Sequence, residues 1–119
     1  MALSIFAALV LAQAPAAVPD VAYAELAAGR NEAANERIEN NPALEADDPA
    51  RLINLGIAHA REGRDQAARA MFRAAVRARE SVRLETASGQ WVDSRDLART
   101  ALAMLDQGAF SAPAAFAAR

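Results

Sequence analysis

Few side chains in this 119-residue chain have the chemistry of a metal or catalytic site, and their spacing assembles neither. His59 is the single histidine, and the chain has no cysteine to join it as a metal ligand or to act as a nucleophile. Glu45, Asp47 and Asp48 suggest a cation loop, but they lack the glycine and the later bidentate glutamate of a calcium loop. We therefore expect no metal site, and we expect His59 to pack between helices.

The remaining polar groups form no catalytic constellation. Ser94 follows Asp93, and this pair fits a helix start better than a nucleophile, because no base and orienting group can be assembled around it. We therefore expect the chain not to be an enzyme and to carry no cofactor. The 13 basic residues, all of them arginines, are balanced by 15 acidic ones, and the net charge is −2. This balance argues against a basic surface for nucleic acid.

The first residues predict export. Leu3–Ala12 is an unbroken apolar run, too short to cross a hydrocarbon layer of about 30 Å as a helix but suited to the core of a signal peptide. Small residues flank Gln13, as at a signal peptidase site. We expect residues 1–14 to be a signal peptide, residues 15–19 a flexible lead-in, and the mature chain to reside in the periplasm or cell envelope of a Gram-negative-type bacterium. The alternatives are an uncleaved membrane anchor and a merely hydrophobic terminus. No basic residue precedes the run, which indicates either a weak signal or a start codon placed too far downstream.

An internal repeat organises most of the remaining chain. Gly29–Asn35 (GRNEAAN) recurs as Gly63–Arg69 (GRDQAAR) at an offset of 34 residues. In each copy the glycine stands between two helical patterns, where it ends the first helix. Asp48 and Pro49 mark the start of the strongest helix, with an N-cap acceptor followed by proline at the first helical position. The pattern predicts helix–turn–helix units at about 20–42 and 48–80.

The second unit resembles a tetratricopeptide repeat. The residues that carry the resemblance are Leu52, Leu55, Gly56, His59, Gly63, Ala68, Phe72 and Ala75. The likeness covers about residues 19–80, the first copy is degenerate, and His59 stands where the family usually has tyrosine. The resemblance implies an all-α fragment of an α-solenoid. In such a fragment Gly56 and Ala68 lie where two helices approach most closely, and Phe72 fills the space beside them.

The pattern changes after the second unit. An alternating polar and apolar segment, a Ser-Gly turn and a short return segment predict a small β-hairpin at about 82–92. A last amphipathic stretch predicts a capping helix at 94–107, which completes a helical domain spanning 20–108. Residues 109–119 show no clear period and are expected to form a frayed tail.

The resemblance also implies where a partner binds. In this family the first helix of each hairpin lines a concave groove, and six residues fall on that side: Tyr23, Leu26, Ile53, Ile57, Ala60 and Arg61. We expect them to contact a peptide or helix, with the alternative that the last helix folds back and covers them. Trp91 is expected either to cover the hydrophobic core or to anchor a partner.

The sequence therefore predicts a non-enzymatic protein–protein interaction module that binds a protein partner in a shallow groove. The alternative is a structural module that self-assembles through the same helical faces. Nucleic acid and metal are not expected as partners, and a membrane is expected only if the N-terminal segment stays uncleaved.

Overall fold

The computed structural model describes residues 21–110 and is mostly helical, with one small antiparallel sheet. In chain order the elements are α2 (Tyr23–Ala27), α3 (Asn31–Glu39), α4 (Pro49–Arg61), α5 (Asp65–Arg77), β1 (Arg83–Glu85), β2 (Trp91–Asp93) and α6 (Ser94–Asp106). The predicted helical class, with a β-hairpin ahead of the last helix, is confirmed. The predicted signal peptide 1–14, the lead-in 15–19 and residues 111–119 of the predicted tail lie outside the described residues.

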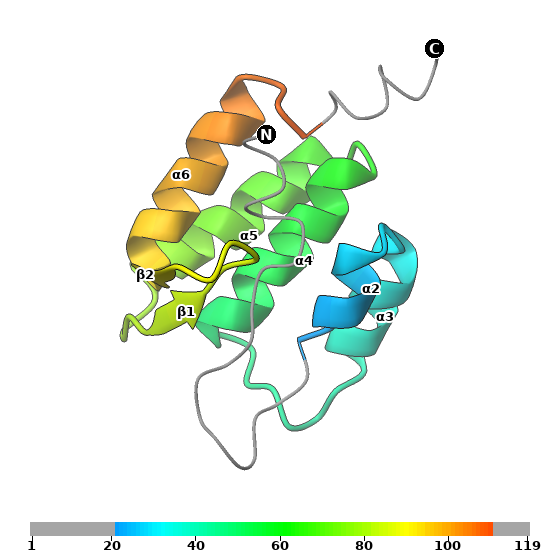
Figure 1. Cartoon of the computed structure of the whole chain (residues 1–119), viewed down its shortest axis with the longest axis horizontal. Coiled ribbons are helices and arrows are strands. Elements are labelled where there is room, and N and C mark those ends of the chain that lie inside the picture. The colour runs from blue at the N-terminus through cyan, green and yellow to red at the C-terminus, as the bar shows by residue number, and fades with distance from the viewer. Residues whose placement is uncertain (1–20, 111–119) are drawn as a thin grey trace.

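Helices α4 and α5 form the centre of the molecule. Helix α6 packs against α5 on one side, and the α2–α3 pair lies on the other side, where α3 contacts α4 (Figure 1). Because neighbours surround α4, every residue from 52 to 58 is buried. This central helix joins the two ends of the domain through a single hydrophobic core.

Two glycine turns close the two helix pairs in the same way. Gly29 and Gly63 have φ angles of 77° and 79°, in the left-handed region that only glycine adopts without strain. After each glycine the next backbone N–H reaches back to the preceding helix. Arg30 N donates to Glu25 O and Arg64 N donates to His59 O, both at 2.8 Å. The two turns, 34 residues apart, therefore match in φ angle and in their closing hydrogen bond.

Side-chain caps set the starts of two helices, as the sequence predicts. Asp48 Oδ1 accepts a hydrogen bond from Arg51 N at 3.0 Å, and Pro49 occupies the first position of α4. Asp93 caps α6 and accepts from the backbone N–H groups of the two residues after Ser94. Both caps satisfy amide groups that the helix itself leaves without partners.

Helices α4 and α5 cross at Gly56. A Cβ atom added at Gly56 would lie 2.4 Å from Cε1 of Phe72, a distance that real Cβ atoms do not tolerate. Phe72 is fully buried, and its ring stacks on Phe110 with centroids 6.0 Å apart. Ala68, on the same helix as Phe72, is also fully buried. Small residues therefore allow the close approach, and the Phe72 ring occupies the space that Gly56 leaves.

The β-hairpin is attached to the start of α6. Leu84 pairs with Val92 in the two-stranded sheet, and Leu84 is buried. Ser94 joins the hairpin to the helix, because its backbone N–H donates to Val82 O at 2.8 Å and its Oγ accepts from Val82 N at 3.0 Å. These contacts give a short hairpin the support that two isolated strands lack.

The predicted frayed tail is wrong for its first two residues. Ala109 N donates to Met104 O at 2.9 Å, which continues the turn that ends α6. Phe110 is buried against Phe72, so the core extends beyond the last helix. The physical reason is that one large apolar side chain is enough to fix a turn to the core, even without a helical period.

Candidate interaction surface

The predicted groove face is buried. Leu26, Ile53, Ile57 and Ala60 expose 1%, 0%, 0% and 2% of their surface, so the prediction that they line an open groove is wrong. Tyr23 is half-buried. The prediction failed because α4 is enclosed by its neighbours and sends both of its apolar sides into the core.

Arg61, the sixth predicted groove residue, acts inside the fold. Its Nη1 donates to Leu26 O at 2.9 Å and to Asn31 Oδ1 at 3.2 Å. Burial lowers the pKa of Arg61 below its ordinary value. The side chain therefore ties the end of α4 to the turn between α2 and α3, and it does not stand at the rim of a groove.

Trp91 is the large hydrophobic side chain that the described part of the chain exposes, at 44%. Strand pairing places it opposite Glu85, and side chains alternate along each strand. Trp91 and Glu85 therefore share the face of the hairpin opposite to that of Leu84 and Val92. Arg83 Nη2 donates to Trp91 O at 3.1 Å and lies on the same face. Of the two roles predicted for Trp91, covering the core does not match this exposure.

The outward side of the hairpin thus carries the Trp91 indole, the Arg83 guanidinium and the Glu85 carboxylate. Asp93 also belongs to this face, but it is occupied as the cap of α6. Although desolvation opposes the change, hydrogen bonds from the backbone of Arg95 and Asp96 and from Ser81 lower the pKa of Asp93. We use the name outer hairpin face for Arg83, Glu85 and Trp91.

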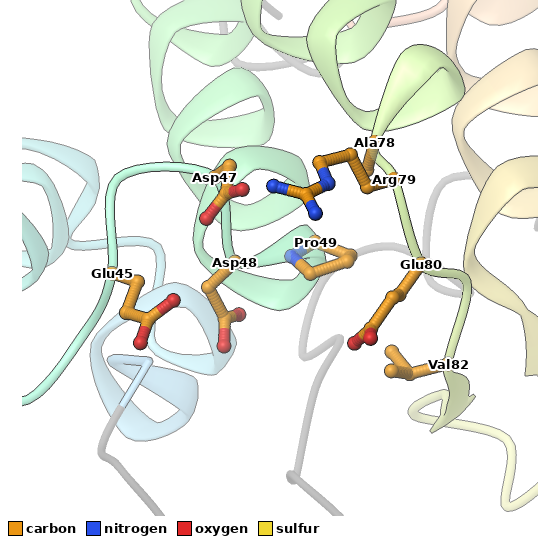
Figure 2. A pocket seen from close by; sticks show the side chains of 8 residues that line it. All are labelled: Glu45, Asp47, Asp48, Pro49, Ala78, Arg79, Glu80 and Val82. Carbon is orange, nitrogen blue, oxygen red and sulfur yellow. The ribbon is translucent and has the colours of Figure 1, made fainter.

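An acidic pocket of about 350 Å³ lies between the start of α4 and the segment that leaves α5. Its lining consists of Glu45, Asp47, Asp48, Pro49, Ala78, Arg79, Glu80 and Val82. Figure 2 shows the loop carboxylates on one side, with the Arg79 side chain extended over Pro49 from the other side. Within residues 21–110 no group of three or more histidine, cysteine or acidic side chains is arranged to hold a metal ion.

Ser94 and His59 both make hydrogen bonds within the fold. Ser94 is buried and bonded to the hairpin backbone. His59 lies at the junction of the two helix pairs, where its Nδ1 accepts a hydrogen bond from Arg64 Nε at 2.9 Å. The position predicted for His59, between helices, agrees with this contact.

Two arginines of these sites were not singled out from the sequence. Arg83 is diagonal to Trp91 across the hairpin, a relation that becomes visible once the register is known. Arg64 follows Gly63 as Arg30 follows Gly29, so the repeat offers a signal for its position but none for its partners. The sequence drew attention to Glu45, Asp47 and Asp48, but it gave no signal that the segment 78–82, about thirty residues later, closes the pocket from the other side.

No protein-family model, curated protein or solved structure matches the chain. Among the helices between residues 21 and 110, none is long and apolar enough to cross a membrane.

Proposed function

We propose that the chain is a tetratricopeptide-like helical-repeat module that binds a partner protein through the outer hairpin face. The single observation that carries the proposal is the exposure of Trp91, at 44%, in a chain whose other large hydrophobic side chains between residues 21 and 110 are more covered. No enzymatic role is proposed.

The repeated turn supports the repeat assignment. Two glycines at an offset of 34 residues have matching φ angles and matching 2.8 Å closing hydrogen bonds. The close approach of Gly56 to Phe72 adds a second family-like feature, because both positions belong to the residues that carry the resemblance. Units of this kind stack to bury a continuous core.

The two ends of the described stack are polar on their outer sides. On α6 the exposed residues include Asp96 and Arg99, and on α3 they include Glu36. Terminal elements of a repeat array need such polar outer faces to remain in water. This polarity favours a finished stack with a separate contact surface over a module that grows end to end.

The composition of the outer hairpin face supports a contact with protein. Tryptophan and arginine are the residue types most enriched at interaction hot spots, and a surrounding polar rim is usual. Here Arg83 is bonded to the backbone at Trp91, and Glu85 stands opposite the indole, so the rim is already in place. The hairpin is held to α6, which limits the ordering that binding requires.

Replacing Trp91 by alanine is expected to abolish partner capture while leaving the fold intact. We expect affinity to fall by about 2 kcal/mol or more, on the order of thirtyfold. The measurement compares tagged chain 15–119 with its Trp91→Ala variant in pull-downs from envelope extracts, quantified by mass spectrometry. Glu36→Ala is the matched control, because Glu36 is exposed on α3 at the far side of the molecule (Figure 1).

If Trp91→Ala retains the captured protein as well as the unchanged chain and Glu36→Ala do, the proposed surface is contradicted. Light scattering at several concentrations distinguishes a foreign partner from a second copy of the chain. A dimer that Trp91→Ala dissolves identifies the second copy as the partner and supports the alternative of self-assembly. A monomer at all concentrations leaves the foreign partner as the proposal.

We also propose that the chain functions in the periplasm or cell envelope. This compartment rests on the apolar run Leu3–Ala12 and the small residues around Gln13, outside the described residues. Mass spectrometry of the chain purified from its native host is expected to show a first residue at Pro15. An intact Met1 terminus in the cytosolic fraction would rule this out.

A further inference from the structure

At the junction between the α2–α3 pair and the α4–α5 pair, three titratable side chains are linked in a row: Glu32, Arg64 and His59. Arg64 stands at its centre, just before α5. Its Nη2 lies 2.9 Å from Glu32 Oε1 and its Nη1 lies 3.4 Å from Glu32 Oε2, while its Nε donates to His59 Nδ1 at 2.9 Å. One guanidinium thereby connects α3 to the last turn of α4.

This arrangement requires a neutral imidazole. Nδ1 of His59 can accept the Arg64 hydrogen bond only while it carries no proton, and in the imidazolium both ring nitrogens are donors. Burial, together with the charge of Arg64, lowers the pKa of His59 below its ordinary 6.5, and Glu39 and Glu32 act in the opposite direction. These three charged groups, two from α3 and one from the turn before α5, are the ones that face the ring.

Protonation of His59 would disrupt this row of linked side chains. Two donors and two positive charges would then meet where Nε and Nδ1 are 2.9 Å apart. The guanidinium would have to leave Nδ1, and the charges of Glu32 and Glu39 would offset the repulsion only in part, because the net effect of the surroundings is to lower the pKa of His59. The contact that Arg64 makes between α3 and α4 would be lost.

We propose that His59 is a pH-responsive latch, whose protonation displaces Arg64 and loosens the α2–α3 pair from α4. The other polar contacts across the junction do not involve this ring. Arg61 still bonds Leu26 O, and Asn54 Nδ2 still bonds Val21 O at 2.9 Å. Acid therefore loosens the pair and does not detach it. This device is independent of the outer hairpin face.

The direction of the pH effect follows from proton binding. Because the pKa of His59 is lower in the latched state than in an opened state, the opened state takes up the proton first as the pH falls. The latch is closed above about pH 6.5 and is lost as the pH falls through the lowered value. The equilibrium between the latched and opened states can shift by at most about tenfold for each unit by which the pKa of His59 differs between them. The reason is that a single proton links the pKa difference to this equilibrium.

The full chain contains one histidine, so its titration by NMR needs no assignment among several rings. We expect a pKa below 6.5, and we expect amide protection factors in α3 to be lower at about pH 5 than at about pH 7. Amides of α5 and α6 serve as the internal reference and are expected to keep their protection. The fall in the α3 protection factors should not exceed about tenfold for each unit by which the measured pKa of His59 lies below 6.5.

His59→Asn is the matched variant. Asparagine places an oxygen near the position of Nδ1, accepts the Arg64 hydrogen bond and has no proton to gain in this range. We expect it to abolish the pH dependence of α3 protection. Arg64→Gln removes the facing charge and is expected to raise the pKa of His59 above that of the unchanged chain.

Three results would overturn the latch. They are a His59 pKa at or above 6.5, a fall in α3 protection that persists in His59→Asn, and an equal loss across α5 and α6, which would indicate acid destabilisation of the whole fold.

Discussion

Replacement of Phe72 by alanine is expected to lower the free energy of unfolding by about 3–5 kcal/mol. The ring is fully buried, lies against Gly56 and stacks on Phe110, so its removal empties a space that three segments share. Gly56 has no side chain that can move into the cavity. Chemical denaturation followed by circular dichroism measures the loss.

Two variants on the same helix make the Phe72 result specific. Ala68→Leu adds bulk at a fully buried position and is expected to cost about 1–3 kcal/mol. Arg73→Ala changes an exposed residue next to Phe72 and is expected to stay within about 0.5 kcal/mol. If Phe72→Ala and Arg73→Ala prove equally mild, Phe72 does not fill the α4–α5 crossing.

The features that were predictable from the sequence are local ones. A positive φ at Gly63 and an N-cap at Asp48 depend on a few neighbouring residues, so the residue types alone indicate them. The approach of Gly56 to Phe72 was also within reach, because the family resemblance places small residues at this crossing. Local chemistry therefore located the helices and their turns.

The exposure of Trp91 required information that the sequence pattern does not hold. Alternation shows that Leu84 and its two strand neighbours face opposite sides, but it does not reveal which return-strand residue stands opposite each. The observed register pairs Glu85 with Trp91, and this pairing places the indole on the outer face. A shift of one residue would have turned Trp91 towards the helix and Val92 towards solvent.

Long-range packing accounts for the predictions that failed. Phe110 belongs to no helical period, so its burial against Phe72 depends on the tertiary arrangement alone. The contact between Arg64 and Glu32, which the sequence did not indicate, likewise joins residues that are 32 positions apart. Arg61 was expected to contact a partner, yet its guanidinium donates a hydrogen bond to the backbone carbonyl of Leu26, which is 35 residues away in the sequence.

The joint replacement of Ile53 and Ile57 by serine is expected to unfold the chain. Each side chain is fully buried on α4, and removing such a side chain costs about 2–5 kcal/mol before the penalty for burying a hydroxyl group. The two losses together approach the whole stability of a small domain, about 5–15 kcal/mol. We expect no cooperative thermal transition in the double variant, whereas Leu102→Ser, at a half-buried position of α6, should retain one at a lower temperature. A double variant that keeps its melting temperature but loses its partner would place these isoleucines at a binding surface, contrary to their burial.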